Sequence, residues 1–307
     1  YKQQDIPFSE MGVLYRARHS SHALETAFRA CHIPCKVIGD YPFYERREVK
    51  DLLAYLRLLV NSNDQAAFVR VVKTPPRGVG EGTVSAVVGY AASQEVTLVE
   101  AARTIPNVRA KQREGLDQVV ALLDKLTILQ DSPGLVETIV EEIGYVTLLQ
   151  KEDDLDDKLG NVRELITSYA QFCQQLVKPD AKSTVDDSAD QVDAVRFQRM
   201  FQPDEADVPV PPPEAYLEYV MLTRSEEEKN TETVQLSTIH AAKGKEYRVV
   251  IVVGCEDGRL PLARATLIPE ELEEERRVFY VAMTRAKDHL HLLYSRECSV
   301  FKDGEMC

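Results

Sequence analysis

The chain has 307 residues, and 44% of them are hydrophobic, so it is long enough to bury one large core or two ordinary ones. No apolar run approaches the roughly 18 residues of a membrane span, which argues against a membrane partner. The net charge is −13, from 50 acidic and 37 basic residues, and this balance disfavours a protein that binds nucleic acid through its overall charge.

The acidic residues are unevenly placed, and this weakens the exclusion of nucleic acid. Much of the acid lies in residues 152–157, 180–207 and 226–228, whereas the stretches around Arg16 and Arg77 are locally basic. Local patches as well as net charge steer a polyanion, so a nucleic-acid partner stays open.

The cysteines indicate the redox compartment, and the first residues indicate whether the sequence begins at a natural N-terminus. Six scattered cysteines, mostly flanked by apolar residues, are typical of free thiols in a reducing compartment. Residues 31–35 (C-H-I-P-C) have a spacing seen in metal sites, but no second pair completes four ligands, so we expect no metal site. Residues 1–5 read as neither a signal peptide nor a natural N-terminus, and we expect a piece of a longer protein.

The chain begins with a predicted strand, helix and strand. Residues 10–16 form a short apolar run, Ser20 or Ser21 can cap a helix, and residues 33–38 form a second run closed by Gly39. This order is typical of an α/β fold.

Two helices and a glycine-rich segment follow. Residues 43–60 carry leucines at helical spacing, and a second helix is predicted over 64–73. Residues 74–83 (T-P-P-R-G-V-G-E-G-T) lack the lysine of a phosphate loop and follow a helix, which excludes a dinucleotide fingerprint. Glycines before a helix can expose backbone N–H groups to a phosphate, and the alternative is a turn that binds nothing.

Residues 83–177 carry only helical signals, which predicts an all-α insertion. Residues 178–213 lose this periodicity and are rich in Asp, Ser and Pro, so we expect a flexible surface loop. A short helix over 214–222 and an acidic linker over 224–233 lead back to the α/β part.

Two β-branched runs, 234–239 and 249–253, flank a polar loop, as expected for buried parallel strands. An amphipathic helix is then predicted over 273–287, with Leu272, Phe279, Met283 and Ala286 on its apolar face and Arg285 in its last turn. Arg285 either lies on a solvated, salt-bridged helix face or is a fixed cation for a phosphoryl group.

Three stretches together resemble the UvrD/Rep/PcrA-type superfamily 1 DNA helicases. T-I-H-A-A-K-G-K-E-Y over 238–247 is similar to motif V of that family, and E-E-E-R-R-V-F-Y-V-A-M-T-R-A over 273–286 is similar to motif VI. F-Y-E-R-R-E-V-K-D over 43–51 is close to another family segment. The resemblance implies an α/β, RecA-like P-loop-NTPase-type domain, 2A, split into residues 1–60 and 230–307 by an all-α insertion domain, 2B, over 61–229.

The resemblance also implies roles for single residues. Arg285 would reach the γ-phosphate of ATP as an arginine finger, Glu246 would bind the ribose, and Gly244 would let the loop approach closely. Single-stranded DNA would be contacted by Arg16, Arg18, Thr238, His240 and Lys243. Duplex DNA would be contacted by Arg77, Gly78, Gly80 and Thr83.

Some residues depart from the family pattern. Arg18 stands where the family has Asn, and Leu262 stands where it usually has His. His240 has a further interpretation, as an inert histidine packed at a strand end.

The chain lacks the Walker A lysine, the acidic Mg²⁺ ligands and the motif IV arginine of the family. We therefore expect Mg²⁺ and most phosphate contacts to come from N-terminal RecA-like domains 1A and 1B of the same polypeptide, and no ATP hydrolysis by this chain alone. The implied partners are single-stranded DNA and its junction with duplex DNA, with 3′-to-5′ translocation. The implied location is intracellular, either a bacterial cytoplasm or a nucleus.

A non-catalytic scaffold with a helicase-derived fold is the alternative, but such modules tend to lose charged motif residues, and Glu246 and Arg285 are both present.

Overall fold

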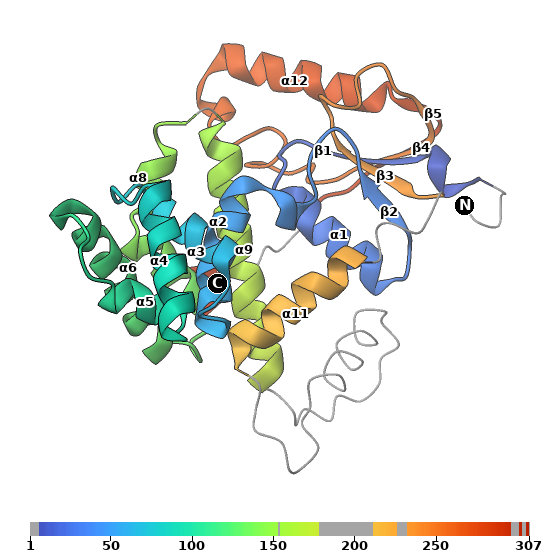
Figure 1. The fold of residues 1–307 in the computed structure, drawn as a ribbon. Helices are drawn as coiled ribbons and strands as arrows, with labels where there is room; N and C mark the ends of the chain where they lie inside the picture. The colour runs from blue at the N-terminus through green and yellow to red at the C-terminus, as the bar shows by residue number, and fades with distance from the viewer. Residues whose placement is uncertain are drawn as a thin grey trace.

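The computed structural model describes residues 6–152, 154–177, 211–225, 232–295, 301–302 and 305–306. A parallel sheet lies to one side of a larger group of helices (Figure 1). The predicted loop over 178–213 and the linker over 224–233 lie largely outside the described residues.

The sheet has five strands in the order β2-β3-β1-β4-β5, and every pairing is parallel. The strands are β1 (Met11–Tyr15), β2 (Cys35–Val37), β3 (Val234–Thr238), β4 (Tyr247–Val252) and β5 (Ala286–Leu292). Because β1 lies between β3 and β4, segments far apart in sequence form one sheet. The predicted α/β class is confirmed.

One helix covers each face of the sheet, as a buried parallel sheet requires. On one face, Leu24 and Phe28 of α1 (Ser20–Ala30) pack with Val13 and Leu236. On the other face, Val278 and Ala282 of α12 (Pro269–Met283) pack with apolar residues of β1 and β4. In Figure 1, α12 runs along the sheet close to β4 and β5.

The end of α12 differs from the prediction. The helix ends at Met283, and Ala286, expected in the helix, is the first residue of β5. Arg285 therefore lies in the turn between α12 and β5. The buried stripe is Glu275, Val278 and Ala282, whereas Leu272 is 42% exposed.

The helical part contains nine described helices. They are α2 (Arg47–Val60), α3 (Gln65–Lys73), α4 (Glu81–Gln94), α5 (Leu98–Thr104), α6 (Ala110–Ile128), α7 (Leu135–Glu142), α8 (Tyr145–Leu149), α9 (Leu155–Val177) and α11 (Pro212–Ser225). Short 3-10 turns lie at Phe8–Glu10, Phe43–Glu45 and Ala265–Leu267, and a two-stranded pair joins β6 (Phe301–Lys302) to β7 (Glu305–Met306).

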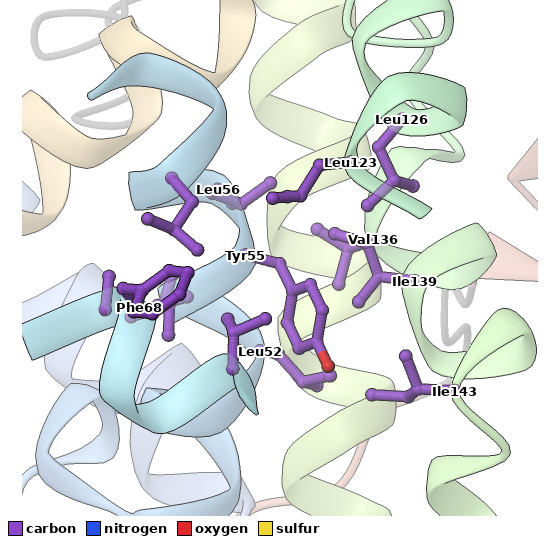
Figure 2. Close-up of a cluster of buried hydrophobic side chains, with 14 of the residues drawn as sticks. Leu52, Tyr55, Leu56, Phe68, Leu123, Leu126, Val136, Ile139 and Ile143 are labelled. Carbon is purple, nitrogen blue, oxygen red and sulfur yellow. The ribbon is translucent and has the colours of Figure 1, made fainter. Parts of the chain in front are cut away.

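The core of the helical part forms around α2. Leu52, Tyr55 and Leu56 point toward Phe68 of α3 and toward leucine, valine and isoleucine side chains of α6 and α7 (Figure 2). We expected α2 to belong with the strands, within residues 1–60. Its buried side chains instead join the helical core, because its apolar stripe packs against α3, α6, α9 and α11.

A buried polar network joins the two parts. The Arg46 guanidinium donates to Ser21 Oγ of α1 at 2.8 Å, to the Arg18 carbonyl at 3.0 Å and to Asn161 Oδ1 of α9 at 2.6 Å. His22 Nε2 lies 3.1 Å from Ser168 Oγ, and burial lowers the pKa of His22 to about 3, so this imidazole is neutral.

Candidate functional site

Residues of the two resemblance motifs meet at the edge of the sheet where β4 and β5 begin. Glu246 directly precedes β4, and Arg285 directly precedes β5. The Tyr247 N–H donates to the Arg285 carbonyl at 2.9 Å, which joins the two turns. Gly244 has a φ of +87°, a left-handed conformation that favours glycine, so its conformation rather than a close contact explains the residue type here.

The turn positions the half-buried Arg285 side chain. Its guanidinium donates to the Val281 carbonyl at 3.1 Å, to the Lys245 carbonyl at 3.2 Å and to Thr284 Oγ1 at 3.0 Å. These bonds use three of the five N–H donors of a guanidinium, so two remain for another acceptor. In the described part of the chain, Arg285 has no carboxylate partner within ion-pair distance, unlike Arg276 and Arg277.

Glu246 is exposed, and its carboxylate lies 3.9 Å from Lys287 Nζ. Both side chains are more than half exposed, so this ion pair contributes little to stability. A carboxylate that accepts hydrogen bonds and two cations on one edge fit the hydroxyl groups and phosphates of a nucleotide. Sequence reasoning missed Lys287 because only Arg285 belongs to the matched motif.

Another group of predicted residues lies at the opposite edge, where β1 and β3 end. Thr238 ends β3, and Thr238 Oγ1 accepts from the Ala241 N–H at 3.2 Å, so its hydroxyl caps the following turn. His240 and Lys243 are exposed. Neighbouring protein atoms exclude water from part of the His240 imidazole, and this desolvation, with the nearby Arg16 guanidinium, lowers its pKa.

Arg16 follows β1 and points to α12. Its guanidinium contacts both carboxylate oxygens of Glu275, with Nε at 2.9 and 3.1 Å and Nη2 at 2.8 Å. Sequence reasoning missed Glu275 because it stands in the acidic run 273–275, which is typical of a solvated face. The available signal was its spacing, since Glu275, Val278 and Ala282 share one helical stripe.

Arg18 lies among carboxylates. Its guanidinium is 3.7 Å from Asp40, 3.9 Å from Asp154 and 3.7 Å from Asp157. The predicted contact of Arg18 with a DNA phosphate would compete with these ion pairs.

The glycine-rich segment lies in the helical part, away from both edges of the sheet. The Arg77 guanidinium donates to the Val71 carbonyl at 2.6 Å and to Tyr55 Oη at 3.1 Å, and Thr83 is 7% exposed. Gly78 and Gly80 are exposed, and Gly80 is the N-cap of α4. Any ligand here would therefore contact the backbone, while Arg77 and Thr83 shape the turn.

The described residues include no group of three or more His, Cys, Asp or Glu side chains placed to bind a metal ion. None of the described helices combines the length and the apolar character that crossing a bilayer would require.

Comparison with known proteins identifies the family. The family model described as "UvrD-like helicase C-terminal domain" matches residues 1–297. Relatives are the ATP-dependent DNA helicase UvrD1 of Mycobacterium tuberculosis (35% identical over 301 residues), DNA helicase II of Escherichia coli (32% over 297) and the ATP-dependent DNA helicase PcrA of Bacillus subtilis (30% over 300).

These matches cover 94%, 94% and 95% of this chain but only 37% of each relative. The chain thus spans little more than a third of the length of the relatives it matches. With its parallel sheet and its two edges of motif residues, the chain belongs to the UvrD-like helicase C-terminal domain family.

Proposed function

We propose that this chain is the C-terminal motor part of an ATP-dependent helicase that moves 3′ to 5′ along single-stranded DNA and unwinds duplex DNA in repair, replication or recombination. The observation that carries the proposal is the placement of two sets of motif residues on one sheet. Glu246 and Arg285 lie at one edge, Arg16 and His240 lie at the other, and the connection between β3 and β4 runs from one edge to the other.

ATP fits the edge at β4 and β5. Arg285 has donors available for a phosphoryl oxygen, and Glu246 can accept from a ribose hydroxyl. ATP supplies the phosphoanhydride whose hydrolysis drives movement, and Arg285 stabilises the charge that develops there. We assign Mg²⁺ and the remaining phosphate contacts to the N-terminal RecA-like domains 1A and 1B.

The domain division follows the packing. We assign the sheet with α1 and α12 to domain 2A and the helices α2 to α11 to the insertion domain 2B. We place the first boundary in residues 40–46 rather than at residue 60, because α2 contributes the centre of the helical core. The second boundary stays near residue 229.

Single-stranded DNA would cross the edge where β1 and β3 end, near Arg16, Thr238, His240 and Lys243. The junction with duplex DNA would reach the exposed backbone of Gly78 and Gly80, which can donate to phosphates. Arg18 would contribute only if its ion pairs with Asp40, Asp154 and Asp157 open. Such an enzyme works where DNA is, in a bacterial cytoplasm or in a nucleus.

The test uses the full-length parent protein. We expect ATP hydrolysis that increases when single-stranded DNA is added, and unwinding of a duplex with a 3′ tail but not of one with only a 5′ tail. An ATP hydrolysis rate that does not change when DNA is added would contradict the proposal. So would a protein that binds DNA but does not hydrolyse ATP, and that result would support the scaffold alternative.

A further inference from the structure

An ion pair between Arg16 and Glu275 connects the sheet to α12, the helix that precedes Arg285. Arg16 lies at the end of β1, and Glu275 lies within α12. The Glu275 side chain is 6% exposed and the Arg16 side chain 21%, so the pair is largely removed from solvent. Glu275 Oε2 also accepts from the Leu262 N–H at 3.3 Å.

Two neighbouring glutamates of α12 form ion pairs that are far more exposed than the pair between Arg16 and Glu275. Glu273 pairs with Arg276 and Glu274 with Arg277, each three residues away, and all four side chains are at least half exposed. Such pairs stabilise a helix only slightly. Burial of the Glu275 carboxylate is costly unless a bidentate partner offsets it, and Arg16 is that partner.

The pair leaves one side of Arg16 available. Glu275 contacts Nε and Nη2, and within the described residues no acceptor lies within hydrogen-bond distance of Nη1. An arginine bound along one edge can present its other nitrogen to a phosphate oxygen. His240 lies close enough to Arg16 for the guanidinium to lower the imidazole pKa, so both residues are on the proposed DNA edge.

We propose that Glu275 is a positioning residue that orients Arg16 toward a phosphate of single-stranded DNA and couples this contact, through α12, to Arg285. Glu275 lies eight residues before Met283, the last residue of α12, about 12 Å along the helix, and the turn after Met283 positions the Arg285 guanidinium. If Arg16 moves when it binds DNA, Glu275 and α12 would therefore move with it, and α12 leads directly to Arg285. This inference rests on the proposed function.

The test compares Glu275→Gln with Glu274→Gln in the full-length parent protein. Each variant removes one negative charge from α12, but only Glu275 contacts Arg16. We expect Glu275→Gln to raise the DNA concentration that gives half-maximal ATP hydrolysis about ten-fold, because a charge-assisted bond to Arg16 is lost. Glu274→Gln should match wild type.

Each single variant is then combined with Arg16→Ala. If Glu275 acts through Arg16, Glu275→Gln has no further effect on the half-maximal DNA concentration in the Arg16→Ala background. A purely structural role would give the same loss in both backgrounds and would overturn the inference, as would a Glu275→Gln enzyme that binds DNA as well as wild type or more tightly. Glu275→Asp, which keeps the charge, provides the same comparison if Glu275→Gln does not fold.

The wild-type enzyme distinguishes failure of the positioning role from failure of the proposed function. If wild-type enzyme shows no DNA-stimulated hydrolysis, the proposed function is wrong. If wild type is stimulated and Glu275→Gln is unchanged, only the positioning role is wrong.

Discussion

Replacing Arg46 with Met tests how the helical part is joined to the sheet. Arg46 is 5% exposed, and its guanidinium donates to Ser21 Oγ, Asn161 Oδ1 and the Arg18 carbonyl at 2.6 to 3.0 Å. It also lies 3.6 Å from the Asp40 carboxylate, whose side chain is 16% exposed. Methionine fills a similar volume but donates nothing.

The expected loss follows from these contacts. Removing one partner of a buried ion pair costs about 3–5 kcal/mol. Arg18 remains 3.7 Å from Asp40 and can compensate in part, so we expect Arg46→Met to lower the free energy of unfolding by about 3 kcal/mol.

The assay is urea unfolding of this chain followed by circular dichroism at pH 7. Arg276→Met is the matched control, because the Arg276 side chain is 75% exposed and pairs with Glu273, whose side chain is 51% exposed. The control should change the free energy of unfolding by less than about 0.5 kcal/mol. Equal losses in the two variants, or a loss below about 1 kcal/mol for Arg46→Met, would refute the reasoning.

Three further predictions concern packing, pH and turnover. Gly115→Ala should lower the free energy of unfolding in urea by about 1–3 kcal/mol, because its Cβ would lie 2.2 Å from the Arg77 carbonyl oxygen. Gly89→Ala should raise it by about 0.5–1 kcal/mol, because no atom lies within 4 Å of the added Cβ and alanine favours the helix. Because burial lowers the folded-state pKa of His22 to about 3, the stabilising contribution of this histidine is present above pH 6.5 and decreases below it. The difference in free energy of unfolding between wild type and His22→Gln, measured in urea, should therefore shrink by about 2 kcal/mol between pH 8 and pH 5. A difference that stays constant over this pH range would refute burial of a neutral imidazole. The purified chain alone should not hydrolyse ATP, and turnover that Glu246→Ala abolishes would contradict the assignment of the remaining ATP site to domains 1A and 1B.

Periodicity predicted the elements with strong local signals. Residues 10–16, 234–239 and 249–253 are continuous apolar runs, and they form β1, β3 and β4 in the interior of the sheet. β5 was missed because it is an edge strand, where Leu290 and Leu292 are 40% and 45% exposed and alternate with His289 and His291. This alternation is typical of a half-buried strand, but it extends over only four residues, 289–292, directly after the helix that was predicted to reach residue 287.

Partners distant in sequence could not be predicted from spacing. Arg16 and Glu275 meet only because β1 lies beside β4, under α12, and Arg18 meets Asp154 and Asp157 only because α9 begins near the end of β1. The motif residues themselves could be identified from the sequence, because Gly244, Glu246 and Arg285 belong to short patterns. Their convergence at one edge required the register of β4 and β5.

The central claim is that Arg285 acts on the phosphoryl group of ATP in a DNA-stimulated motor. The most direct measurement is DNA-stimulated ATP hydrolysis by the full-length parent protein for wild type, Arg285→Ala and Arg277→Ala. Arg277 belongs to the same helix and pairs with Glu274 at the surface, so it controls for loss of one cation. We predict that Arg285→Ala lowers kcat by about two orders of magnitude or more while Arg277→Ala matches wild type. Equal rates for Arg285→Ala and wild type would contradict the claim and leave Arg285 as a hydrogen-bonded residue of a turn.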